Sequence, residues 1–438
     1  MRIAWLTPFS VNSAIGKFSR CVVEALASAA IDVNLCHFDS GEILATSARV
    51  LEFSSAEDFV ANAREQYELI VYNLGNCLPY HKEIFRASRG LPGVCILHDF
   101  VMRDFFAEYC RTHHGNSSSY SLLMERLYGL TGRVFSESGI RDADQEFEFP
   151  MFEEAMRGAR GVIVHSEFFR QRVAKVFAGP VCRIPLAYNV PHSDAIASRE
   201  ELGIATDAVL IVTVGHVNPN KRVDDVIRAL ARIRADKVVE YAIAGSCQAS
   251  YRRYLEEVAD QRGIGGHVRL LGHVPDGVLR SYLECADICV NLRYPNSEGA
   301  SASVIEEMLL GKPVIVNDSG FFSELPKDCV AKVSSLDESE LAAQLDRLIM
   351  DPNLRMRLGT QAREFAALEY RSEQYAAAIL DFAREVRSAS PLLDLADNVA
   401  NELNRMGVTP NAEIVDVVSD HLHSVFCSET GTLPQLRA

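Results

Sequence analysis

Residues 293–317 read RYPNSEGASASVIEEMLLGKPVIVN. Glu298 and Glu306 stand eight positions apart, and the small residues between them, 299–303, lead into a pattern that predicts a helix. At a helix start, unpaired backbone amides and the helix dipole favour phosphate. A carboxylate before the loop can reach one end of a bound ligand, and one about two turns into the helix can reach the other. This is the geometry expected for holding a sugar–diphosphate–nucleoside.

A charged surface helix would also explain two glutamates. The apolar residues after the loop argue against it, because Val304, Ile305 and Met308 continue as a buried stripe. Glycine and serine are also poor formers of helix interiors, so a run of them has little reason to exist in a surface helix.

Short apolar runs alternate with helical patterns on either side of this stretch, which predicts an α/β protein with parallel sheets covered by helices. Many of these runs are continuous and β-branched, as strands buried on both faces should be. Ligands of such folds bind at the carboxyl ends of the strands. The expected strands cover residues 3–6, 33–38, 69–72, 94–97, 162–165, 210–214, 241–244, 268–271, 288–291 and 314–317.

The length of 438 residues predicts two or three domains. Pro185, Asn189 and the residues after them interrupt the pattern and predict a linker, which divides the chain into α/β domains at 1–190 and 191–371. Helices are expected at 338–350, 352–368 and 372–388. The remainder, 389–438, predicts a helical tail with two amphipathic helices, which fits either oligomerisation or packing on the core.

Residues from about 102 to 156 break the alternation of the first domain. They include three consecutive serines at 117–119 and seven acidic residues from Glu137 to Glu154, both included. This insertion predicts either a helical lid or acceptor-binding element, or a solvated surface excursion, and charge alone does not choose between them.

The net charge of −15 argues against nucleic acid as a partner. Eleven cysteines, odd in number and without paired metal-ligand spacing, indicate reduced thiols and no metal site. The first apolar run stops at Pro8, and no stretch approaches the ~20 apolar residues of a membrane span. We therefore expect a cytosolic protein, with at most peripheral contact to the inner face of the cytoplasmic membrane.

Two residues in the first domain are candidate ligand contacts. Gly16 stands where a helix expected over 18–29 begins after the first strand, so its backbone can approach a phosphate or sugar; it can equally serve only the turn. His98 follows the strand at 94–97, where the ring can hydrogen-bond a substrate hydroxyl or phosphate. Alternatively, His98 packs as a structural residue against the insertion.

The second domain has a comparable strand end. Gly215 follows the strand at 210–214, and Lys221 and Arg222 precede the next helix. A glycine turn and a lysine at the crevice of an α/β sheet form a cation site for a diphosphate. An ordinary surface lysine in a loop is the alternative.

Together these features resemble the retaining glycosyltransferases of the GT4 family, glycosyl transferases group 1, over about residues 1–388. The resemblance implies the GT-B fold: two Rossmann-like domains facing a cleft, with the helix at 372–388 crossing back to the first domain. It also implies that the first domain binds mainly the acceptor and the second binds the nucleotide sugar.

The resemblance assigns roles to individual residues. Glu306 matches the glutamate that binds the nucleoside ribose, and Glu298 the glutamate near the donor sugar. The loop amides of Ser301, Ala302 and Ser303 match those that contact the diphosphate and sugar. Lys221 matches the diphosphate-binding lysine, with Gly215 in its turn, His98 the histidine at the reacting end of the donor, and Gly16 the glycine under the phosphates.

Two positions depart from the family pattern. The arginine that often precedes the lysine by five residues is His216 here. Either Arg222 supplies that charge, or the phosphates are held less firmly. The frequent Gly-Phe-Gly after the first glutamate is replaced by Gly299-Ala300-Ser301. These departures bear on the choice of donor more than on the fold.

The resemblance implies a metal-independent transfer of a hexose from a nucleotide-diphosphate sugar, GDP-mannose or a UDP-hexose, to a glycan or lipid-linked acceptor in bacterial surface polysaccharide or lipopolysaccharide assembly. No cofactor is expected. A non-hydrolysing sugar-nucleotide epimerase of the same architecture and a catalytically inactive binding protein are the alternatives.

Overall fold

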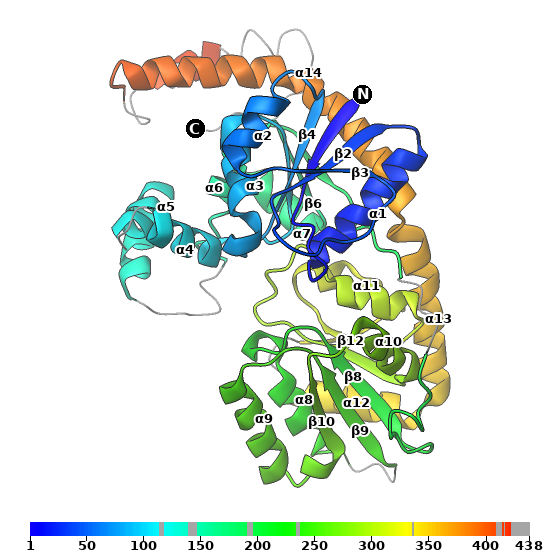
Figure 1. Ribbon diagram of the computed structural model, residues 1–438. Helices are drawn as coiled ribbons and strands as arrows, with labels where there is room; N and C mark the ends of the chain where they lie inside the picture. Colours follow the sequence, from blue (N-terminus) through cyan, green and yellow to red (C-terminus); the bar gives the residue numbers. More distant parts are fainter. Residues whose placement is uncertain are drawn as a thin grey trace. The chain divides into compact units, whose positions relative to one another are not determined.

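A computed structural model describes residues 1–113, 118–138, 147–190, 196–233, 237–334, 337–408, 414–415 and 417–421. The chain forms two compact units (Figure 1). The first consists of Met1–Pro185 with Glu373–Ala438, and the second of Leu186–Ser372. The sequence predicted boundaries at 190–191 and 371–372.

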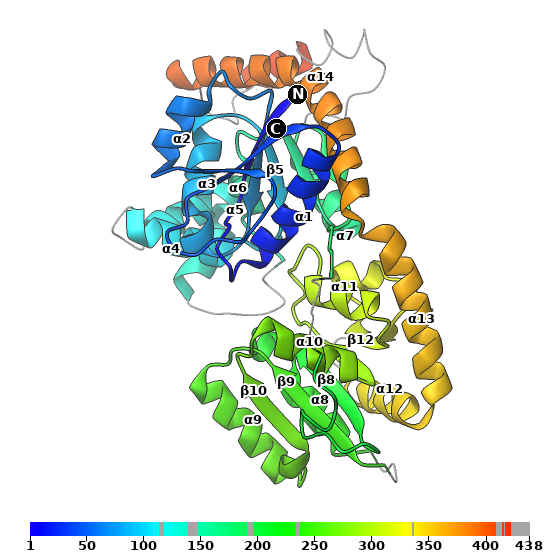
Figure 2. The same ribbon diagram turned by 45° about the vertical axis from the view of Figure 1, so that its right-hand side comes forward.

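The first unit is built on a seven-stranded parallel sheet. Helices α2 (Ala56–Ala63) and α3 (Leu78–Gly90) lie on one side of it, and α1 (Ala14–Ser28) on the other (Figures 1 and 2). The strand order is β3 (Arg49–Glu52), β2 (Asp32–His37), β1 (Arg2–Leu6), β4 (Leu69–Leu74), β5 (Val94–Leu97), β6 (Gly161–Val164) and β7 (Val181–Arg183), and α7 (Glu167–Val173) connects the last two.

The insertion in the first unit is helical where the structure describes it. It contains α4 (Arg103–His113), α5 (Ser118–Ser138) and α6 (Phe152–Met156). Phe105, Phe106, Met124 and Phe152 are buried in the same hydrophobic core as the sheet. The helices are therefore anchored to the unit by apolar packing. Ser117 and the acidic residues within 139–146 lie outside the described residues.

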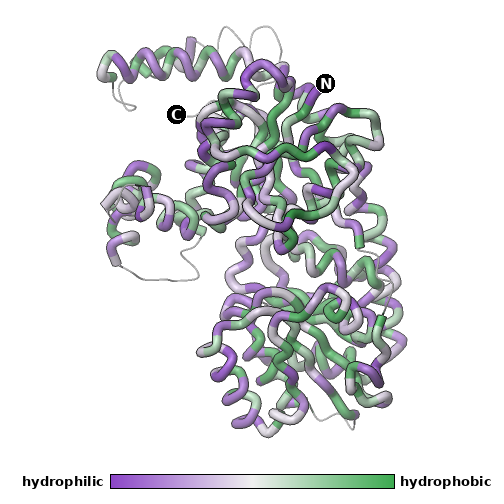
Figure 3. The backbone as a smooth tube through the Cα atoms, in the orientation of Figure 1, coloured by the Kyte–Doolittle hydropathy of each residue, from purple (hydrophilic) through white to green (hydrophobic). Residues whose placement is uncertain are grey.

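The second unit is built on a six-stranded parallel sheet. Its strand order is β10 (Val268–Gly272), β9 (Val239–Ala244), β8 (Val209–Val214), β11 (Ile288–Asn291), β12 (Val314–Asn317) and β13 (Ala331–Val333). The helices around it are α8 (Val223–Leu230), α9 (Ala249–Gln261), α10 (Asp276–Cys285), α11 (Ala302–Leu309), α12 (Glu338–Met350) and α13 (Pro352–Glu369). The predicted class of two parallel α/β sheets is confirmed. Figure 3 shows hydrophobic backbone segments, coloured green, inside each unit.

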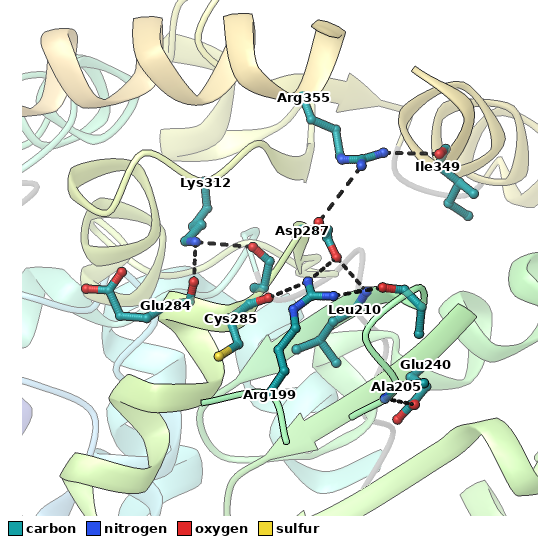
Figure 4. A network of polar contacts seen from close by, with 12 residues as sticks. Arg199, Ala205, Leu210, Glu240, Glu284, Cys285, Asp287, Lys312, Ile349 and Arg355 are labelled. Atoms are coloured by element: carbon teal, nitrogen blue, oxygen red, sulfur yellow. Dashed lines mark hydrogen bonds and ion pairs between the residues drawn. The ribbon is translucent and has the colours of Figure 1, made fainter. Parts of the chain in front are cut away.

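A polar network fixes the amino ends of strands β8 and β11 (Figure 4). Asp287 accepts hydrogen bonds from the Leu210 amide at 2.9 Å and from the Arg199 guanidinium at 2.5 Å. Arg355 of α13 lies 3.9 Å from the same carboxylate. These contacts tie Arg199, which precedes β8, and helix α13 to the amino ends of the strands. Other loops lie at the opposite, carboxyl ends of the strands.

The last long helix, α14 (Ser372–Arg405), does not end at 388 as predicted, although Pro391 lies within it. Residues beyond the proline still bind the first unit, because Arg160 forms ion pairs with Asp394 and Asp397 at 2.6 and 2.8 Å. The helix is followed by Gly407, whose φ of 77° is one that glycine adopts without strain. Residues 422–438, the end of the predicted helical tail, lie outside the described residues. Among the described helices, none has the length and apolar character of a membrane-spanning segment.

Candidate functional site at the carboxyl ends of the second sheet

Gly215 and Lys221 form one compact turn after β8. Gly215 has a φ of 99°, and Lys221 follows in the short 3₁₀ helix Pro219–Lys221. The ammonium folds back under the turn, where Nζ donates to the Val214 carbonyl at 2.5 Å. A Cβ on Gly215 would lie 3.2 Å from that Nζ. The glycine thus provides both the backbone conformation and the room for a lysine that is only 2% exposed.

The loop before α11 brings a second cation to the carboxyl ends of the strands. The Arg293 guanidinium lies 2.6 Å from Glu298 Oε1, and the Arg293 amide donates to Asn317 Oδ1 at 2.6 Å. The Tyr294 amide donates to the Asn220 carbonyl at 2.9 Å, which joins this loop to the lysine turn. Glu298 and Lys221 also interact electrostatically. The structure therefore brings together two residues that are far apart in the sequence.

Helix α11 begins where the sequence predicted, with Ser301 at the N-cap position. The Ser303 hydroxyl accepts a hydrogen bond from the Asn291 side chain at 2.7 Å and lies 3.1 Å from the Ser301 hydroxyl. The amides of Ala302 and Ser303 stand in the first turn, where a helix leaves amides without intrahelical partners. An anion placed there would meet both these amides and the positive end of the helix dipole.

Two adjacent glutamates of α11 have different surroundings. Glu306 is partly exposed, and its Oε2 accepts a hydrogen bond from the Tyr188 hydroxyl at 2.8 Å. Glu307 is wholly buried, and its Oε1 accepts from the Asn291 side chain at 3.3 Å. The sequence reasoning missed Glu307, as well as Arg293 and Asn291. The helical spacing of Ser303 and Glu307, four residues apart and hence on one face, was the signal that could have pointed to it.

Charge and burial oppose one another in this cluster. Burial lowers the pKa of Lys221, and so does the neighbouring Arg293, whereas Glu298 and Glu307 raise it. Burial raises the pKa of Glu307. Two cations and two carboxylates are thus held at the carboxyl ends of β8 and β11. Such a cluster can neutralise an added diphosphate with fixed charges.

Arg222, the predicted substitute for a missing arginine, already has partners. Its backbone is left-handed, with a φ of 53°, and its guanidinium forms an ion pair with Asp225 in the first turn of α8. The guanidinium carbon also lies 5.8 Å from the centre of the Tyr294 ring. His216 is exposed, with Nδ1 2.9 Å from the Ser246 hydroxyl. A role of Arg222 toward a diphosphate stays a prediction, in which its charge would be shared with Asp225.

In the first unit, Gly16 lies inside the first turn of α1, because the helix starts four residues earlier than the predicted residue 18. Ser13 is the N-cap, and its hydroxyl accepts from the Gly16 amide at 2.9 Å. A Cβ on Gly16 would lie 2.7 Å from the Pro8 carbonyl oxygen. This glycine therefore permits close packing of the turn, and its amide hydrogen already has an acceptor.

His98 is also in the first unit and is 9% exposed. Its Nε2 lies 3.0 Å from Asn73 Oδ1, and its Nδ1 lies 3.3 Å from Nε2 of His165. Both ring nitrogens thus have partners within the unit. A contact between this ring and a donor sugar stays a prediction, and it would require one of these two contacts to open.

The number of N–H groups on the two rings limits how many of these contacts can be hydrogen bonds. Asn73 donates its amide group to the Leu6 carbonyl, so its Oδ1 accepts from His98. His165 Nδ1 faces the Ile184 carbonyl at 3.0 Å, which also accepts. With a hydrogen between the rings, the three contacts need three N–H groups, but two neutral imidazoles carry only two. Burial lowers the pKa of His165 to about 4 and that of His98 well below its usual value, which favours the neutral pair with one contact lacking its hydrogen.

The first unit also contains a cavity of about 550 Å³ beside the loops after β1 and β2. Ser10, Asn12, Asp39, Glu42 and Tyr80 are among its lining residues. Among the described residues that line it, none is a lysine or arginine. The cavity therefore offers hydroxyl, amide and carboxylate groups and no cationic side chain for an anionic ligand.

Most of the second unit is similar to a known protein family. Residues 194–365 match the family described as glycosyl transferases group 1. A D-inositol 3-phosphate glycosyltransferase of Thermobifida fusca is 31% identical over 198 residues, which are 43% of this chain and 44% of that protein. An uncharacterized glycosyltransferase of Methanocaldococcus jannaschii is 26% identical over 215 residues, 46% of this chain and 54% of that protein. The chain thus spans about half the length of the curated relatives it matches.

Solved structures extend the similarity to the whole fold. The sucrose-phosphate synthase of Thermosynechococcus elongatus matches 89% of this chain and 100% of its own, with a TM-score of 0.64 and 19% identity. Anabaena HepE in complex with UDP-glucose matches 87% of this chain and 99% of its own, with a TM-score of 0.61 and 18% identity. The chain therefore has the GT-B fold, and its residues 194–365 are similar to the glycosyl transferases group 1 family.

Proposed function

We propose that this chain is a retaining glycosyltransferase that moves a hexose from a nucleotide-diphosphate sugar to a glycan or lipid-linked acceptor. One observation carries the proposal: Lys221, Arg293 and the first turn of α11 stand together within the residues that match the family. They form a site for the charge that a leaving diphosphate develops. Stabilising that charge is the dominant catalytic contribution, and it needs no metal ion.

In the proposed donor complex, the first-turn amides of α11 and Lys221 bind the diphosphate. Glu306 binds the ribose on one side, and Glu298 binds the sugar on the other. The Arg293 ion pair holds Glu298 in place, and the Tyr188 hydroxyl does the same for Glu306. The acceptor hydroxyl attacks from the face that the diphosphate leaves, and the leaving phosphate takes its proton, so the configuration of the sugar is retained.

The donor is proposed to be a UDP-hexose or GDP-mannose. The UDP-glucose bound to Anabaena HepE supports a UDP-hexose. A mannosyltransferase of Mycolicibacterium hassiacum, 29% identical over 152 residues, keeps mannose among the candidates. For the acceptor, the cavity in the first unit supports a hydroxyl-rich sugar, because its carboxylates accept hydrogen bonds from hydroxyl groups and repel phosphate. Such an acceptor fits bacterial surface polysaccharide assembly.

Thermal-shift screening against UDP, GDP, ADP and dTDP sugars identifies the donor, because a ligand that binds only the folded state raises its stability. Transfer is then measured with that donor, and NMR of the product gives the anomeric configuration. Donor converted in the absence of any acceptor would indicate an epimerase instead. Binding without turnover over a wide acceptor panel would indicate an inactive binding protein.

We predict that Lys221→Ala and Glu298→Gln each reduce kcat at least about a hundredfold, which is the order seen when one fixed electrostatic contact to a transition state is removed. Lys237→Ala is the matched control, because this lysine is exposed and belongs to the same unit. Circular dichroism of each variant checks the fold. Wild-type turnover in both site variants would overturn the proposal.

A further inference from the structure

Glu307 is an ionisable group that the proposed mechanism does not use. Its side chain is 0% exposed, in the second half of α11. Oε1 accepts one hydrogen bond from Asn291, and Oε2 makes no hydrogen bond with any residue that the structure describes. A wholly buried carboxylate with so little hydrogen bonding is costly unless a neighbouring charge balances it.

Lys221 presents the complementary problem. Its ammonium is buried against the Val214 carbonyl, an uncharged acceptor. Of the three nearby glutamates, Glu298 is paired with Arg293 and is about one-third exposed. Glu306 is partly exposed and receives the Tyr188 hydroxyl. Glu307 is the one of the three that is wholly buried, and it interacts electrostatically with Lys221.

We infer that Glu307 is the counter-ion of Lys221 and thereby a positioning residue of the donor site, which keeps one proton within the Lys221–Glu307 pair. The inference rests on the proposed function, since it takes Lys221 to be the cation that meets the diphosphate. Glu307 itself touches no donor atom. It acts through the charge of the lysine.

The groups that face the pair act in both directions. Burial and Arg293 lower the pKa of Lys221, and Glu298 and Glu307 raise it. For Glu307, burial raises the pKa most, Glu306 adds to that effect, and Lys221, Asn291 and Arg293 lower it. The thiol of Cys289 has a pKa raised by burial and by Glu307, so it remains neutral. The protonation of the base and that of the acid therefore depend on one another, and their titrations belong to the pair.

The shared proton has a consequence for ligand binding. In the wild type, an arriving diphosphate needs the proton on the amine, and the pair already holds it, on either partner. In Glu307→Gln, the amide can supply neither a negative charge nor a proton. The pKa of Lys221 then falls further, so a diphosphate that binds above this pKa must draw a proton from solvent.

Isothermal titration calorimetry with UDP and with GDP tests this directly. At pH 8, titrations in two buffers of different ionisation enthalpy give the number of protons taken up on binding. We expect this number in Glu307→Gln to exceed the wild-type value and approach one, with nucleotide affinity reduced about tenfold or more. At pH 6 the two affinities should converge. A merely structural role for Glu307 would weaken binding equally at both values.

Glu240→Gln is the matched control. Glu240 is also a buried carboxylate of the second unit, but it lies near the amino end of β9, where it accepts from the Ala205 amide (Figure 4). Its other oxygen pairs with Arg269. Its proton uptake and nucleotide affinity should equal those of the wild type. Unchanged proton uptake and an unchanged pH profile in Glu307→Gln would overturn the inference.

A second measurement separates this inference from the proposed function. Wild-type protein that binds neither nucleotide would count against the proposed function alone. The lysine Cε NMR signal, assigned by its loss in Lys221→Arg, reports the protonation of Lys221 without any ligand. A midpoint that moves to lower pH in Glu307→Gln supports the counter-ion role, and one that stays in place rejects it. Glu307→Asp, which restores a carboxylate, should move the midpoint back toward that of the wild type.

Discussion

Gly245 shows how closely backbone segments pack at the carboxyl ends of β8 and β9. The Gly215 amide donates to the Ala244 carbonyl at 2.9 Å, and the Gly245 amide donates to the Gly272 carbonyl at 2.8 Å. A Cβ on Gly245 would lie 1.9 Å from the Gly215 carbonyl oxygen. Because the obstructing atom is backbone, the turn that carries Lys221 would have to move to admit even a methyl group.

We therefore predict that Gly245→Ala destabilises the second unit by about 1–3 kcal/mol, the usual cost of forcing atoms into a packed region, and weakens nucleotide binding through displacement of the Lys221 turn. Thermal unfolding and calorimetry with UDP and GDP measure the two effects. Gly277→Ala in α10 is the control, because a Cβ there would meet no atom within 4 Å. Equal behaviour of the two variants would contradict the prediction.

Single residues of the site differ in how far a sequence can reveal them. Local sequence patterns predict a strand end, a loop of small residues and a helix at the positions of Glu298, Glu306 and Lys221. The roles of Arg293 and Glu307 depend on partners that only the folded chain brings near. Arg293 pairs with Glu298, and Glu307 interacts electrostatically with Lys221. Partner identity at such distances is not encoded by any local spacing.

The same distinction holds among the secondary structure elements. The ten predicted strands are the ones with continuous apolar runs, and all are found. The three strands that were missed are short, stand at sheet edges and carry fewer apolar residues: β3, β7 and β13. An edge strand pairs on one side only, so burial does not impose the continuous apolar run that predicts a strand. The end of α14 was misplaced because Pro391 reads as a helix breaker, whereas Arg160 holds the residues beyond it.

The apolar stripe of α14 gives a prediction at the scale of this element. Ile379 is 0% exposed on the stripe with Tyr375, Phe382 and Val386, and Leu395 of the same helix is 39% exposed. Ile379→Ala should destabilise the first unit by about 2–5 kcal/mol, because it leaves a cavity in a packed core. Leu395→Ala should change stability by less than about 0.5 kcal/mol.

Trp5 makes this measurement specific to one unit. It is the single tryptophan of the chain and is buried in β1, so its fluorescence during urea unfolding reports the first unit. Similar midpoints for the two alanine variants would show that α14 contributes little to that unit.

At the scale of the whole molecule, the two units differ in their ionisable interiors. The second unit buries a lysine and a glutamate at the proposed donor site. The first buries several imidazoles, among them those of His81, His98 and His165. A unit that keeps histidines uncharged in its core is weakened by acid, since the unfolded chain takes up protons that the folded unit excludes. Acid should therefore act on the first unit through histidine side chains, at pH values where most carboxylates are still ionised.

We predict that the stability of the first unit falls as the pH is lowered from about 6.5, the usual pKa of an unfolded histidine, toward 4. Burial lowers the pKa of both His81 and His165 to about 4, so above 6.5 neither state binds these protons and stability does not change with pH on their account. Between the two values the unfolded state binds more protons, and each histidine contributes a loss of about 1.4 kcal/mol per pH unit.

Urea unfolding followed by Trp5 fluorescence from pH 7 to 5 measures this slope. His81→Gln and His165→Gln should each reduce it by about one histidine's share, whereas His113→Gln, at an exposed position, should leave it unchanged. If both buried variants leave the dependence of stability on pH unchanged, the folded unit itself binds these protons. The His98–His165 pair would do so if it kept a third hydrogen for its three contacts.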